Sequence, residues 1–111
     1  MTCILFTPQG PNGILYLPRA PGDGSYPSSA PVSLAGKVTD RAAIIRLRSN
    51  GAFWINFGDA TVNAAGRKGT FIEAPATTIL GIPASATHFA VAADDPGQLP
   101  TNQTLYYSVG Y

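Results

Sequence analysis

Two short runs of alternating residues, joined by a turn signal, constrain the fold of this chain more than any other feature. They lie within residues 42–59, AAIIRLRSNGAFWINFGD. In the first run, alternate positions set an apolar face against a mainly basic one: Ala43, Ile45 and Leu47 against Ile44, Arg46 and Arg48. The second run repeats the alternation with larger side chains: Phe53, Ile55 and Phe57 against Trp54 and Asn56. A period of two predicts strands, and Asn50-Gly51 between them predicts a β-hairpin at the centre of an all-β domain.

Further strand-like runs continue to the end of the chain, separated by residues that break strands. We expect strands at residues 42–49, 52–57, 69–74, 77–82, 86–93 and 103–109. Pro75, Pro83 and the Asp/Pro/Gly cluster at residues 94–97 mark the turns between them. No segment has a helical period long enough to predict a helix. The pattern is typical of a single antiparallel β-sandwich or small barrel.

The first 40 residues have a different texture, because six of the ten prolines lie there. Proline fixes φ and removes a hydrogen-bond donor, so these residues cannot lie inside a paired central strand. Two strand-like pieces remain, at residues 13–17 and 32–35. We predict that residues 1–40 form an extended N-terminal arm and loops, and that residues 41–111 form the sandwich. Such an arm would lie on a neighbouring protein, and the alternative is a simple surface loop.

The chain is poor in charge, which bears on what it can bind. At 111 residues it is one domain, and charged residues make up 12%, half of the usual ~25%. The net charge of +1 provides no basic stripe for nucleic acid. No apolar run approaches the length of a membrane span, and the first residues lack the pattern of a signal peptide. We therefore expect much of the surface to face other protein.

Side chains that usually perform catalysis or hold metal ions are sparse. Cys3 is the only cysteine, which excludes an internal disulfide and a thiolate metal site. His88 is the only histidine, and no serine lies in a Gly-x-Ser-x-Gly elbow. The glycines at residues 66–69 lack the spacing of a phosphate-binding loop. We expect no enzymatic activity, no metal and no cofactor.

Aromatic and arginine side chains outside the predicted core are the candidates for binding, since protein interfaces are enriched in them. The candidate contact residues are Tyr16, Leu17, Tyr26, Arg46, Arg48, Trp54, Asn56 and Tyr106. On the predicted hairpin, the face that needs a partner consists of Arg46, Arg48, Trp54 and Asn56. A carbohydrate-binding role is an alternative, with Trp54 and Tyr106 as a stacking platform.

Three short motifs and a closing strand follow one another from residue 42 to residue 111. They are Ile45-Arg46-Leu47, Trp54-Ile55-Asn56-Phe57-Gly58, Ile72-Glu73-Ala74-Pro75 and the terminal TLYYSVGY. In this order they resemble small structural proteins encoded in the head modules of tailed phages. The resemblance implies a virion component, above all a capsid decoration (cement) protein with a β-sandwich or jelly-roll fold and no catalytic residues.

Such proteins usually bind the major capsid protein as dimers or trimers across capsomer junctions. The resemblance thus implies a homodimer or homotrimer on the capsid surface, assembled in the host cytoplasm, with no nucleic acid and no membrane as partner. Another virion role, in the tail, the head–tail junction or a fibre base, is the alternative within the same class.

Overall fold

The computed structural model describes residues 6–17, 28–73, 77–94 and 103–111. Within them it contains eight strands and no helix. The strands are β1 (Pro8–Leu17), β2 (Val32–Ser33), β3 (Ile44–Ser49), β4 (Phe53–Gly58), β5 (Thr70–Ile72), β6 (Thr77–Gly81), β7 (His88–Ala93) and β8 (Gln103–Gly110). All six strands expected after residue 41 are present, so the all-β prediction is confirmed.

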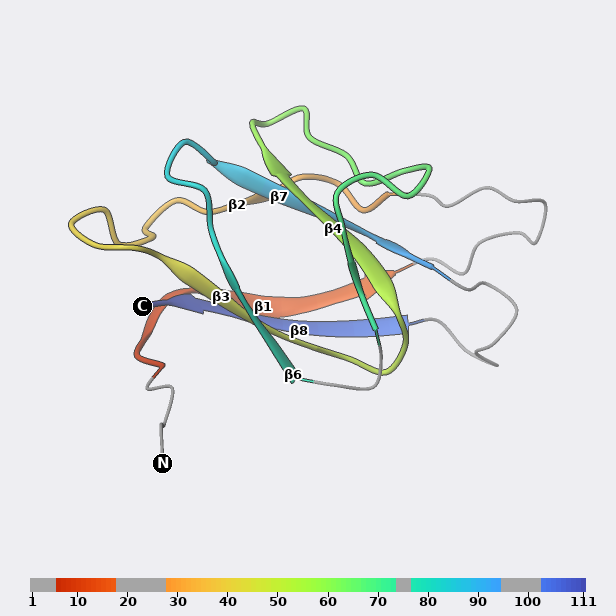
Figure 1. The fold of residues 1–111 in the computed structure, drawn as a ribbon, viewed down its shortest axis with the longest axis horizontal. Coiled ribbons are helices and arrows are strands. Elements are labelled where there is room, and N and C mark those ends of the chain that lie inside the picture. Colours follow the sequence, from red (N-terminus) through yellow and green to blue (C-terminus); the bar gives the residue numbers. More distant parts are fainter. Residues whose placement is uncertain (1–5, 18–27, 74–76, 95–102) are drawn as a thin grey trace.

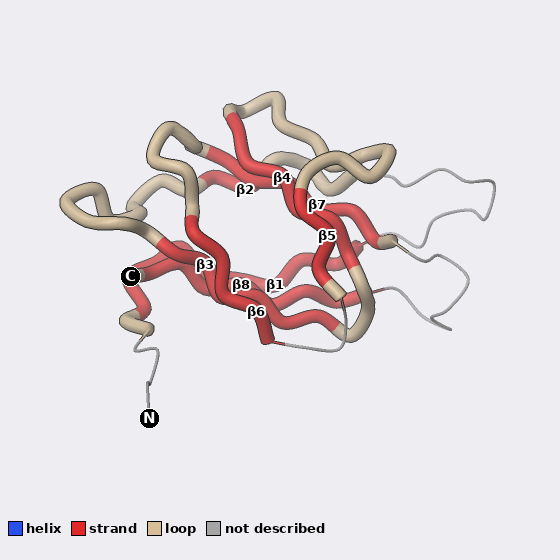
Figure 2. Tube along the Cα trace, viewed as in Figure 1, coloured by secondary structure: helices blue, strands red, loops and turns tan. Residues whose placement is uncertain are grey.

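The strands form two antiparallel sheets packed face to face (Figures 1 and 2). Sheet A has the order β1-β8-β3-β6, and sheet B has the order β2-β7-β4-β5. The first strand therefore pairs with the last, the second with the seventh, and so on inwards, as if one long antiparallel ribbon were rolled up. This is the strand order of a jelly roll, so the predicted sandwich is confirmed.

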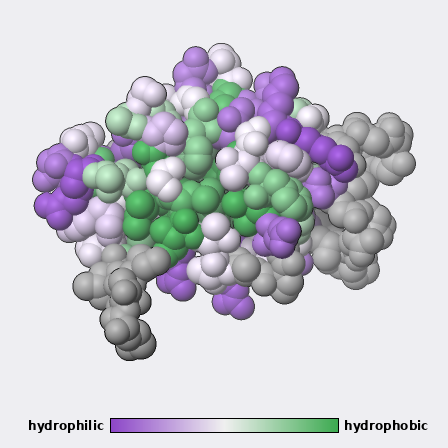
Figure 3. Space-filling view, viewed as in Figure 1, coloured by the Kyte–Doolittle hydropathy of each residue, from purple (hydrophilic) through white to green (hydrophobic). Residues whose placement is uncertain are grey.

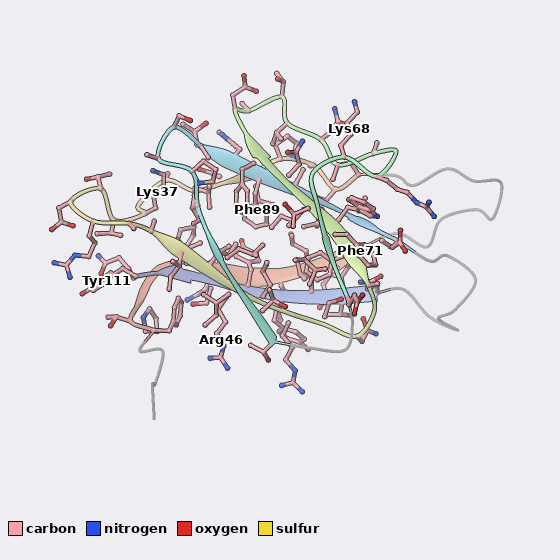
Figure 4. The ribbon with its side chains drawn as sticks, in the orientation of Figure 1. Lys37, Arg46, Lys68, Phe71, Phe89 and Tyr111 are labelled. Atoms are coloured by element: carbon pink, nitrogen blue, oxygen red, sulfur yellow. The ribbon has the colours of Figure 1, made fainter. Side chains whose placement is uncertain are left out.

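The inward faces of the two sheets meet in one hydrophobic core. The buried aliphatic and aromatic side chains of β3 and β8 in sheet A are Ile45, Leu47, Leu105 and Val109, and those of β4 and β7 in sheet B include Phe53, Ile55, Phe89 and Val91. Phe89 lies between the sheets (Figure 4), fully buried, with its ring 5.1 Å from that of Tyr107 and 6.5 Å from that of Phe57. The alternation expected along β3 and β4 is confirmed.

The hairpin predicted for β3 and β4 is wrong. β3 pairs with β6 and β8 in sheet A, whereas β4 pairs with β5 and β7 in sheet B. Residues 50–52 therefore cross from one sheet to the other. In a hairpin, the two apolar faces would lie side by side and would still need a second layer to cover them. When the connection crosses instead, each face covers the other, as the layers of a sandwich do.

The segment predicted as an N-terminal arm contributes one strand to each sheet. β1 pairs with β8 at one edge of sheet A, with a shift in register between Pro8 and Asn12. β2 pairs with β7 at one edge of sheet B. These strands belong to the sandwich, so the boundary expected at residue 41 does not separate them from the domain. The prolines of β1 are tolerated because an edge strand has one unpaired side.

Gly69 allows the connection between β4 and β5 to approach the sheet closely. Its φ is +99°, and a Cβ at this position would overlap the carbonyl oxygen of Ile55. We expect Gly69→Ala to lower the free energy of unfolding, measured by urea denaturation, by about 1–3 kcal/mol. Gly36 is the matched control because its φ is +93° and a Cβ added there would meet nothing within 4 Å. Equal losses from Gly36→Ala and Gly69→Ala would contradict a contribution from the close contact.

Candidate interaction surface

The outer face of sheet A brings together four of the residues that the sequence indicated. The cross-strand register places one row across all four strands: Ile14, Tyr106, Arg48 and Thr77. The next row consists of Asn12, Ser108, Arg46 and Ile79. Tyr16 lies beside Thr104 at the same face. We call the set Ile14, Tyr16, Arg46, Arg48 and Tyr106 the tyrosine–arginine face.

The large apolar and aromatic side chains of this face are open to solvent. Tyr16 is 72% exposed, Tyr106 is 52% exposed and Ile14 is 48% exposed. Single exposed hydrophobic residues are common on protein surfaces, but adjacent ones mark interaction sites. Ile14 directly opposes Tyr106 on the next strand, so these side chains form one patch.

Arg46 and Arg48 add positive charge to the same patch, and Figure 4 shows Arg46 projecting away from the sandwich. Within the described residues, neither arginine has a carboxylate within 4.0 Å, whereas Arg41 lies 3.5 Å from Asp40. A surface concavity of about 720 Å³ lies over β3 and β8, lined by both arginines and by the hydroxyl-bearing residues Thr104, Tyr106 and Ser108. The face can therefore accept carboxylates together with apolar groups from another molecule.

Trp54 and Asn56 lie on the other side of the molecule, on the outer face of sheet B. The predicted face combining them with the two arginines is wrong, because β3 and β4 belong to different sheets. The Trp54 ring lies 5.2 Å from that of Phe71, and its Nε1 donates a hydrogen bond of 2.7 Å to Asp94 Oδ1. Asn56 Nδ2 donates to the carbonyl oxygen of Asn63 at 3.0 Å. Both side chains are half-buried and bonded within their own chain.

The carbohydrate platform predicted from Trp54 and Tyr106 is likewise wrong, since the two rings lie on opposite faces of the sandwich. A stacking platform needs rings that one ligand can contact at the same time. The indole N–H of Trp54 is also already committed to Asp94.

Two further candidates have different outcomes. Leu17 is fully buried in the core of its own chain, so its side chain is not available to a partner. Tyr26 lies outside the described residues. Ile14 was missed as a contact residue, although alternation along residues 13–17 places it on the same face as Tyr16.

The pKa values of Asp59 and Tyr107 are shifted from their ordinary values. The hydroxyl and backbone N–H of Thr61 donate to Asp59 Oδ1 at 2.6 and 2.8 Å, and these bonds lower the pKa of Asp59. Burial raises the pKa of Tyr107. In the described part of the chain, no three His, Cys, Asp or Glu residues come together in a way that could hold a metal ion. The same described residues include no membrane-spanning helix.

No protein-family model, no curated protein and no solved structure matches this chain.

Proposed function

We propose that this chain is a non-enzymatic structural protein of a phage virion, a capsid decoration protein that binds the outer capsid surface and stabilises the shell. The observation that carries the proposal is the tyrosine–arginine face. Tyrosine and arginine dominate the binding energy of many protein interfaces, and here they share one open sheet face with Ile14. The motif resemblance supplies the phage context. The jelly-roll order, which viral capsid proteins and lectins also use, supports it by analogy of fold.

The chemistry of the face suggests how it would act on a shell. The exposed rings and Ile14 would bury apolar area against capsid subunits, which stabilises a contact by about 25 cal/mol per Å². The two guanidinium groups would pair with carboxylates of the major capsid protein and set the orientation of the bound molecule. Because both contributions require a second protein, they would appear as increased stability of the assembled shell.

The test is binding to preformed capsids that lack this protein. We expect the double variant Arg46→Glu/Arg48→Glu to bind at least about tenfold more weakly than wild type, because carboxylates would replace the groups that meet the acidic partner. Co-sedimentation measures occupancy, and thermal disruption of the particles measures shell stability. Lys37→Glu/Lys68→Glu is the matched control, since it changes the net charge equally and lies away from the face.

Two outcomes would contradict different parts of the proposal. Equal occupancy of the capsid by the wild type and the arginine double variant would contradict a contribution of Arg46 and Arg48 to binding. Binding to purified tails and not to heads would contradict the decoration role and favour a tail, head–tail or fibre-base component. Deleting residues 1–30 would not test capsid binding by an N-terminal arm on its own, because the deletion would also remove β1 and the buried Leu17 from the sandwich.

A further inference from the structure

Each sheet ends in two edge strands, and β6 lacks the protection that the other three described edges have. β1 contains Pro8 and Pro11 and has a shift in register. β2 and β5 are only two and three residues long. Short strands, prolines, bulges and charges are the usual means of blocking an exposed edge. β6 has five residues, TTILG, with neither proline nor charge.

The edge strand itself carries apolar side chains, whereas Arg46 and Arg48 lie opposite Ile79 and Thr77 on the neighbouring strand β3. Figure 3 shows hydrophobic residues gathered in the middle of the visible face, over β6 and adjoining strands, with hydrophilic residues around them. Ile79 and Leu80 of β6 are only half-buried. No charged residue occurs in the sequence between Glu73 and His88. Among the described residues the outer side of β6 is therefore unpaired, and the strand itself is uncharged with Ile79 and Leu80 as its large side chains.

We infer that β6 pairs with β6 of a second copy of this chain, antiparallel and about a two-fold axis. Pairing over all five residues places Ile79 of one copy opposite Ile79 of the other, and Thr77 opposite Gly81. The unpaired N–H and C=O groups of each edge then find partners, and two four-stranded sheets join into one of eight strands. The contact is isologous, as in most homodimers.

The distribution of charge favours a second copy as the occupant. An uncharged edge brings no like charges together, whereas self-association through the tyrosine–arginine face would bring four guanidinium groups together. In the joined sheet, the nearest Arg46 side chains originate three strand spacings apart, about 14 Å, which exceeds the screening length of about 8 Å at physiological salt. The dimer therefore accommodates both basic faces.

A two-fold axis perpendicular to the joined sheet keeps both tyrosine–arginine faces on the same side. The dimer would thus present two copies of that face to one surface, which raises the effective affinity for a repeating partner. The dimer itself does not rest on the proposed function, because it requires no capsid. If the wild-type chain forms the dimer but does not bind capsids, the proposed function is contradicted and the dimer is not.

The first test is the mass of the full chain in solution, measured by light scattering during size-exclusion chromatography over a range of concentrations. We expect a dimer for wild type and at least about a tenfold higher dissociation constant for Ile79→Lys, because two ammonium groups would meet at the axis. Ile14→Lys is the matched control at the opposite edge of the same sheet and should remain dimeric. Circular dichroism checks that each variant keeps its strands.

The second test does not depend on a destabilising substitution. In a Cys3→Ser background, mild oxidation of Ile79→Cys should yield a disulfide-linked dimer, because opposed residues of paired strands have Cα separations that fit a disulfide. Ile14→Cys should remain monomeric on non-reducing gels. A strictly monomeric or a trimeric wild type, or a dimer that Ile79→Lys leaves intact and Ile79→Cys does not link, would overturn the inference.

Discussion

Replacing Phe89 with alanine is expected to lower the free energy of unfolding by about 3–5 kcal/mol, the usual range for removing a large aromatic side chain from a core. Phe89 is fully buried on β7. Its ring contacts Tyr107, which comes from the other sheet, in an edge-on geometry with 5.1 Å between centroids. Removing the ring would leave a cavity where the two sheets meet. The free energy of unfolding of a domain is only about 5–15 kcal/mol, so this loss is a large fraction of the total stability.

Urea denaturation followed by far-ultraviolet circular dichroism measures this loss. Phe71→Ala is the matched control, because it removes the same side chain from an edge strand where it is 39% exposed. We expect the control to lose about 1 kcal/mol, since solvent can fill most of the space. Comparable losses from the two substitutions would show that the core is not centred on Phe89.

Replacing Gln103 with leucine is expected to lower the free energy of unfolding by about 1–3 kcal/mol, because it leaves the buried carbonyl oxygen of Gly51 without its donor, whereas Ser49 Oγ and the carbonyl oxygen of Ala52 each accept a second hydrogen bond. Gln103 is buried at the start of β8. Its Nε2 lies 2.7 Å from Ser49 Oγ, 2.6 Å from the carbonyl oxygen of Gly51 and 3.1 Å from that of Ala52. These groups belong to the segment that crosses from β3 to β4. Leucine has similar volume, so the substitution tests hydrogen bonding more than packing.

Asn50→Ala is the control for this crossing. Asn50 Oδ1 accepts a hydrogen bond from the backbone N–H of Thr104 at 2.9 Å, but at an exposed position where water can replace it. We expect a loss below about 1 kcal/mol in the same denaturation experiment. If Gln103→Leu costs no more than Asn50→Ala, the amide of Gln103 does not hold the crossing in place.

Much of the fold could be predicted from the chain because strand formation has a local signature. The alternation of Ile45 and Leu47 with Arg46 and Arg48 indicated which side of β3 is buried, and the structure agrees. Proline placement indicated that β1 cannot be a central strand, and it lies at an edge. The error at residues 50–52 arose because Asn-Gly is compatible with a turn within one sheet and with a crossing between two sheets.

The candidate surface was only partly predictable for the same reason. Arg46 and Arg48 were correctly placed on an outward face, but Trp54 was assigned to that face through the hairpin that does not form. Tyr106 lies opposite Arg48 because β8 pairs with β3, although more than 50 residues separate them in the sequence. Alternation along residues 13–17 places Leu17 on the face opposite Tyr16, so the two could not share one contact face, but the pairing of β1 with β8 decided which face is buried.

Local patterns along the chain were enough to place the strands and to indicate which side of each is apolar, because breakers and a period of two act over a few residues. The choice of neighbouring strands became visible only in the folded molecule, because hydrogen-bond pairing joins residues far apart along the chain. That choice separates Trp54 from the arginines and gathers Tyr16, Tyr106, Arg46 and Arg48 on one face. It also leaves β6 at an edge, where its unpaired backbone groups meet solvent or a second copy.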